Sequence, residues 1–161
     1  MSKQTTQKLF VFLVVLVASI NTASAQSFFV GLSGVGVSVP VGSGISVGGS
    51  FYGLQAGSYD LFGAFGLRAS GELGSGAIAG LNQAAVDLIY TSGGGSKLVL
   101  GAGAGAIFIE DFINPYAEVI VGGDFVIASS FVSFFIEGQG RFYPSTSGFL
   151  FPAHLGFNFH F

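Results

Sequence analysis

Apolar and polar residues alternate along most of this chain, and the alternation is clearest at its C-terminal end. Leu155, Phe157, Phe159 and Phe161 are separated from one another by single small or polar residues, up to the last position. Because successive side chains of a β-strand point to opposite faces, this period of two predicts a strand with one continuously apolar face. Four large apolar groups on one face fit a lipid-facing strand better than a strand of a soluble sandwich.

The same alternation, interrupted by turns rich in Gly, Pro, Ser and Asn, continues through the rest of the chain. One of these turns is expected at Gly57-Ser58-Tyr59. Each segment is near the ~9–11 residues that a tilted membrane strand requires. The predicted strands are 28–38, 44–56, 60–72, 80–91, 97–109, 115–127, 130–143 and 149–161.

Charged residues share one face of several segments, opposite the apolar face. In the seventh segment, for example, Phe134 and Ile136 alternate with Glu137 and Arg141. Apolar residues outside and Arg, Glu and Gln inside are typical of a membrane barrel. The faces of the first two segments cannot be separated by their pattern. The charged residues that we assign to the inward faces are Arg68, Glu72, Asp87, Glu118, Glu137 and Arg141.

Composition points in the same direction. Half of the residues are apolar and only 8% are charged, against about 25% in ordinary soluble domains. After the first 25 residues no apolar run approaches the roughly 20 residues of a membrane helix. A closed barrel is the alternative that pairs every backbone group within the hydrocarbon. We therefore predict an all-β fold, a closed antiparallel up-and-down eight-stranded transmembrane β-barrel in one domain.

The N-terminal residues have the pattern of an export signal. A positive start is followed by a short apolar run and a small-residue cleavage site, which predicts a cleaved signal peptide at residues 1–25 and a barrel at 26–161. An uncleaved anchor is the alternative, but no positive stop-transfer cluster follows the run. The residues concerned are Lys3, Lys8, 9–18, Ala23, Ala25 and the expected mature start, Gln26.

The remaining charges exclude some partners. Without residues 1–25, three basic residues face eight acidic ones, which argues against nucleic acid. The chain has no cysteine, so no disulfide framework holds it together.

Candidate chemical motifs are weak. The glycine-rich runs 74–79 and 101–106 match a relaxed dinucleotide fingerprint, but neither opens an amphipathic helix. His154 and His160 lie on one strand face, too far apart for a dyad, and no triad or metal-ligand spacing stands out. We expect no catalytic, cofactor or metal site, and no enzyme activity.

Two segments, 135–143 and 155–161, resemble the last two strands of the small eight-stranded outer-membrane barrels. That group includes the OmpA membrane domain and the OmpX-like and OmpW-like proteins. The resemblance implies a place in the outer membrane, with lipid and the barrel-assembly machinery as partners. It also implies an assembly signal formed by Leu155, Phe157, Phe159 and Phe161. Loops of about seven residues or fewer give no basis for the adhesin, receptor or protease activities of that group.

The inward charges have two possible roles. One is a network that fills the lumen and fixes the strand register, and the other is a gate in which Arg–carboxylate pairs rearrange. We predict a monomeric, non-enzymatic barrel with a structural role in envelope integrity. A small gated pore, cation-preferring because of its acidic excess, or a hydrophobic-ligand conduit is the alternative. A secreted soluble ligand-binding barrel is a further possibility, and it requires Phe134, Ile136, Phe157 and Phe159 to point inward.

Overall fold

The computed structural model is built from antiparallel strands and describes residues 28–40, 46–76, 78–109, 112–128 and 131–161. The predicted signal peptide, with Ala23, Ala25 and Gln26, lies outside these residues. None of the described segments forms a helix that is long and apolar enough to cross a membrane. The strands are β1 (Phe28–Pro40), β2 (Ser46–Phe62), β3 (Phe65–Gly76), β4 (Leu81–Ser92), β5 (Lys97–Ile109), β6 (Phe112–Ala128), β7 (Val132–Tyr143), β8 (Gly148–Leu150) and β9 (Ala153–His160).

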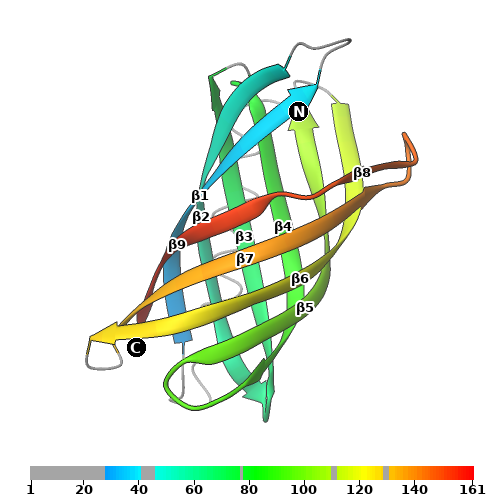
Figure 1. Cartoon of the computed structure of the whole chain (residues 1–161). Helices are drawn as coiled ribbons and strands as arrows, with labels where there is room; N and C mark the ends of the chain where they lie inside the picture. The colour runs from blue at the N-terminus through cyan, green and yellow to red at the C-terminus, as the bar shows by residue number, and fades with distance from the viewer. Residues whose placement is uncertain (1–27, 41–45, 77, 110–111, 129–130) are drawn as a thin grey trace.

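These strands form one sheet that closes on itself (Figure 1). Each of the strands β1 to β7 pairs with the next strand in the chain, and β9 pairs with both β7 and β1. The closing pair runs from Phe29 opposite His160 to Gly34 opposite Leu155. The sheet therefore has no free edge, and the prediction of a closed, antiparallel eight-stranded barrel is confirmed.

The eighth barrel strand consists of two pieces. Both β8 and β9 pair with β7, and Phe151 and Pro152 lie between them. Pro152 has no N–H to donate, which interrupts the strand, but its carbonyl still accepts the backbone N–H of Gln139 at 2.9 Å. The predicted single strand 149–161 is thus one barrel strand with a break at the proline.

The second strand runs past the turn that we expected at Gly57-Ser58-Tyr59. The turn lies at Gly63-Ala64, where Gly63 has a φ of +74° and Phe62 pairs with Phe65. Two-residue hairpin turns favour glycine at such a position because it has no Cβ. The prediction was wrong because Gly57 is needed inside the sheet: a Cβ there would lie 2.3 Å from the carbonyl oxygen of Leu67 and 3.1 Å from the ring of Phe29.

The inward and outward faces alternate as expected. In β7, Ser133, Phe135, Glu137, Gln139 and Arg141 are buried, while the residues between them are at least partly exposed. The same alternation resolves the faces of β1 and β2, which the sequence left open. Their inward residues include Phe29, Val35, Phe51, Gln55 and Tyr59.

Candidate functional site in the barrel interior

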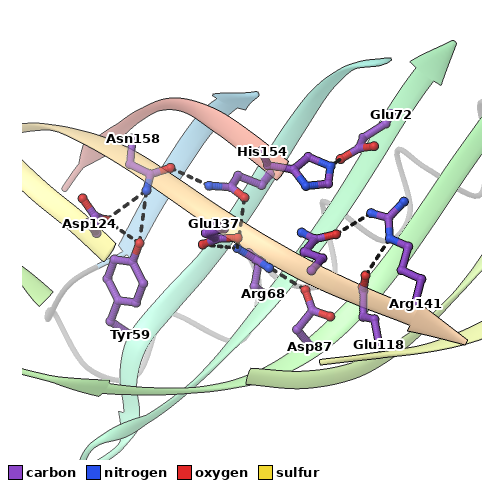
Figure 2. A network of polar contacts seen from close by, with 12 residues as sticks. Tyr59, Arg68, Glu72, Asp87, Glu118, Asp124, Glu137, Arg141, His154 and Asn158 are labelled. Atoms are coloured by element: carbon purple, nitrogen blue, oxygen red, sulfur yellow. Dashed lines mark hydrogen bonds and ion pairs between the residues drawn. The ribbon is translucent and has the colours of Figure 1, made fainter. Parts of the chain in front are cut away.

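The interior of the barrel contains a chain of buried polar side chains. All six charged residues that we assigned inward are buried, with no more than 5% of their surface exposed. They reach across the barrel and contact residues of strands that are not their neighbours in the sheet. Figure 2 shows this arrangement.

Arg68 of β3 is the centre of the middle group. Its Nε donates to Asp87 Oδ2 at 3.0 Å, and its Nη1 donates to both carboxylate oxygens of Glu137 at 2.7 Å. Nη1 also lies 3.4 Å from Gln55 Oε1. Glu137 belongs to β7, on the far side of the barrel, so this ion pair links opposite walls.

Arg141 of β7 is the centre of a second group. Its Nε donates to Glu118 Oε2 at 3.0 Å, and its two Nη atoms donate to Gln83 Oε1 and Gln139 Oε1, each at 2.6 Å. The guanidinium carbon also lies 4.9 Å from the centre of the Tyr116 ring, which is within cation–π distance.

Glu72 extends this second group. It accepts a hydrogen bond from Gln83 Nε2, and its Oε1 lies 2.8 Å from His154 Nε2. The other ring nitrogen of His154 has no partner, although the side chain is only 2% exposed.

A third group surrounds Asp124. The Tyr59 hydroxyl donates to Asp124 Oδ2, and Asn158 Nδ2 donates to the same oxygen at 3.0 Å. Asn158 Oδ1 in turn accepts from Gln55 Nε2 at 2.8 Å, which connects this group to Arg68.

Sequence reasoning missed several members of these groups. Asp124, Gln55 and Gln83 were not singled out, and Tyr59 was assigned to a turn. Asp124 lies an even number of residues from Glu118 on the same strand, so this spacing could have identified it as an inward residue. Gln55 and Tyr59 could not be placed, because the faces of the second strand were unresolved.

A serine, a histidine and an aspartate meet near the end of β9, but they do not form a catalytic triad. Ser133 Oγ lies 2.7 Å from His160 Nε2, and Asp124 Oδ2 lies 3.9 Å from the same nitrogen. A triad needs the serine and the carboxylate on different ring nitrogens. Among the described residues, no group of three or more His, Cys, Asp or Glu side chains is placed to hold a metal ion.

Two clusters of buried apolar side chains flank the polar groups. One cluster, Phe29, Tyr59, Ile89 and Val99, lies toward the end where β1 begins and β9 finishes. A second cluster, formed by Val35, Phe51 and Ile78 with Leu81 against it, lies at the other end. Buried polar groups and apolar clusters toward both ends thus occupy the interior of the barrel.

The four residues of the predicted assembly signal lie on the outer surface of the last strand. Leu155, Phe157 and Phe161 are 53%, 46% and 70% exposed, and Phe159 is partly buried against Phe131. The backbone N–H of Phe161 donates to the carbonyl of Phe28 at 2.9 Å, so the final residue takes part in closing the barrel.

No protein-family model and no curated protein matches this sequence. Among solved structures, the chain is similar to the crystal structure of the N-terminal β-barrel domain of Pseudomonas aeruginosa OprF. The TM-score is 0.63, with 17% sequence identity, and the match covers 86% of this chain and 100% of that one. The chain therefore has the fold of the small OmpA-like barrels, as the resemblance of its last strands predicted.

Proposed function

We propose that this chain is an outer-membrane protein that crosses the bilayer as one closed barrel and has a structural, non-enzymatic role in the cell envelope. The observation that carries this proposal is the inverted distribution of side chains, with charges inside and large apolar groups outside. Leu32, Tyr52, Leu73, Val119 and Ile136, from five strands, are between 49% and 65% exposed. A soluble monomer does not expose a continuous apolar surface of this kind.

The backbone supports the same proposal. Hydrocarbon offers no hydrogen-bond partners, so a membrane-spanning sheet must pair its first strand with its last. The pairing of β1 with β9 meets this requirement.

A soluble ligand-binding barrel fits the structure poorly. It requires Phe134, Ile136, Phe157 and Phe159 to line an apolar cup, but these side chains are on the outer face. The rings of Phe134 and Phe157 pack against each other there, 5.6 Å apart.

The contacts between interior side chains support the structural role. Side chains that bond to one another across the barrel stabilise a fixed strand register and leave no room for a substrate. Outer-membrane lipid and the barrel-assembly machinery are the partners that such a role requires.

Membrane extraction tests the proposal. The protein should stay with the outer-membrane fraction through a carbonate wash and dissolve only in detergent. Folded and boiled samples should migrate differently on a detergent gel, because a closed barrel resists that detergent when cold. Quantitative release by carbonate would rule out the membrane-spanning barrel.

The processing of the N-terminus tests the export route separately. Mass spectrometry of the membrane-extracted protein should show a chain that begins at Gln26, because a small-residue site follows the apolar run. An intact N-terminus would contradict export by a cleaved signal peptide.

A small pore is the second candidate, and the acidic excess of the interior favours it. Five buried carboxyl groups face two arginines there, so any path through the barrel would prefer cations. Conductance distinguishes this candidate from the structural role.

A further inference from the structure

The middle of the barrel contains one more carboxyl group than it has positive charges. Asp87, Glu118 and Glu137 are paired with only two guanidinium groups, those of Arg68 and Arg141. All five side chains are almost completely buried.

The other two interior carboxyl groups have basic side chains as neighbours. Glu72 lies against His154. Asp124 lies 3.9 Å from His160 Nε2 and is paired in the sheet with Lys97, whose ammonium lies over the Tyr59 ring. In the central group, by contrast, the carboxyl groups outnumber the guanidinium groups with which they pair.

The geometry identifies where this excess is concentrated. In the part of the chain that the structure describes, two buried carboxylate oxygens have no hydrogen-bond partner, Asp87 Oδ1 and Asp124 Oδ1, and only that of Asp87 belongs to the central group, where Oδ2 accepts from Arg68. Asp87 Oδ1 points over Gly103, because a Cβ added to Gly103 would lie 2.1 Å from it. Gly103 is paired with Asp87 on one side and with Glu118 on the other, so the two carboxyl groups meet over this glycine.

Two ionised carboxylates in contact, with no donor between them, are not stable in a closed interior. An unpaired buried charge costs so much that the group takes up a proton instead, and adjacent carboxyl groups then share that proton. Arg68 and Glu137 face the pair from one side, and Arg141, Tyr116 and Glu72 face it from the other. One added positive charge brings the central group to neutrality.

We propose that Asp87 and Glu118 form a proton-binding site, in which one proton is held in an O–H···O hydrogen bond between the two carboxyl groups. The site joins the Arg68 group to the Arg141 group, so the polar chain is continuous from Asp124 to His154. It requires only a closed interior and does not depend on the proposed function.

Amide variants provide the test. In Asp87→Asn or Glu118→Gln, the amide N–H takes the place of the shared proton and the amide oxygen still accepts from the arginine. Asp124→Asn is the matched control, because Asp124 lies outside the central group and accepts from Tyr59 and Asn158 through one oxygen only. All variants are made in the full chain and refolded in detergent.

Infrared spectroscopy in heavy water reports the proton directly. The unmodified protein at neutral pH should show the carbonyl band of a protonated carboxyl group. The band should disappear in Asp87→Asn and in Glu118→Gln and remain in Asp124→Asn. Absence of the band from the unmodified protein, or its survival in both pair variants, would overturn the proposal whether or not every variant folds.

The pH dependence of folding provides the second readout. Above the range in which the carboxyl groups of the unfolded chain ionise, only the folded state retains the proton, so stability falls as the pH rises. The folding equilibrium constant of the unmodified protein, relative to Asp87→Asn, should fall about tenfold per pH unit until the folded protein also releases the proton, and should then level off. A ratio that is independent of pH but rises when sodium or potassium replaces a bulky organic cation would show that a metal cation holds the charge, and would refute the proton site.

Discussion

Glycine makes room for the buried charges of this barrel. Three inward glycines each face a polar side chain of a neighbouring strand: Gly103 faces Asp87, Gly31 faces Asn158 and Gly53 faces Glu72. A Cβ at any of these glycines would lie within 2.6 Å of an atom of the side chain that it faces. A narrow barrel can contain long polar side chains only if other inward positions are empty. The high glycine content is thus partly a packing requirement of the polar interior.

Substituting Gly103 tests this requirement. In Gly103→Ala, the methyl group would collide with Asp87 Oδ1 and with the carbonyl oxygen of Val86, at 2.1 and 2.5 Å. We expect a loss of about 1–3 kcal/mol in the free energy of unfolding, the usual cost of overpacking, measured by urea titration in detergent.

Gly138→Ala is the matched control for this substitution. Gly138 is on the outer face of β7, and the nearest atom to its added Cβ lies 3.9 Å away. Its free energy of unfolding should change by no more than about 0.5 kcal/mol. Equal losses in the two variants would show that the interior adapts to the extra methyl group.

At the level of the strand, β9 has two tasks that its alternating pattern combines. Its inward residues His154 and Asn158 join the polar groups, while its outward residues form part of the apolar surface. Its backbone closes the sheet against β1. A change at its end therefore affects closure before it affects the interior.

Deleting Phe161 should lower the amount of barrel in cells sharply, because assembly must pair this end of β9 with β1. The same variant refolded in detergent should still form a sheet. Losing one interfacial ring should cost no more than about 1.5–3 kcal/mol of stability. Membrane levels are measured by immunoblot, and refolding is measured by circular dichroism.

Phe149→Ala is a suitable control for the deletion. Phe149 is 67% exposed, against 70% for Phe161, but it lies in β8 at the other end of the same barrel strand. The amount of the Phe149→Ala variant in cells should equal that of the unmodified protein. Unchanged levels for the Phe161 deletion would show that the C-terminal pattern is ordinary strand alternation.

For the whole molecule, the filled interior and the apolar clusters toward its two ends make a standing aqueous path unfavourable. Arg68, a side chain of β3, pairs with one carboxylate of β4 and one of β7. Such contacts between walls of the barrel oppose flattening of its cross-section.

Planar-bilayer recordings should therefore show little or no steady conductance, and any brief openings should favour cations because of the acidic excess. A preparation of detergent without protein provides the baseline. Large, long-lived channels in a pure preparation would favour the pore over the structural role.

The sequence by itself determined the properties that depend on neighbouring residues. The alternation of side chains in a strand is a local property. The sequence alone therefore predicted that Arg68, Glu118 and Arg141 point inward and that Leu155 points outward. Closure could also be predicted, because a chain so apolar and without a later long apolar run has few other ways to pair its backbone.

Only the tertiary structure decided which of the inward groups meet. Arg68 pairs with Glu137 and Gln83 with Arg141 because closure and strand tilt bring non-neighbouring strands opposite each other, and no local pattern encodes that stagger. The turn at Gly63 replaced the expected turn near Tyr59 for the same kind of reason, since Gly57 is needed where the ring of Phe29 packs. The contact of Asp87 with Glu118 over Gly103 joins three adjacent strands, and it exists only when β4, β5 and β6 are paired in this register.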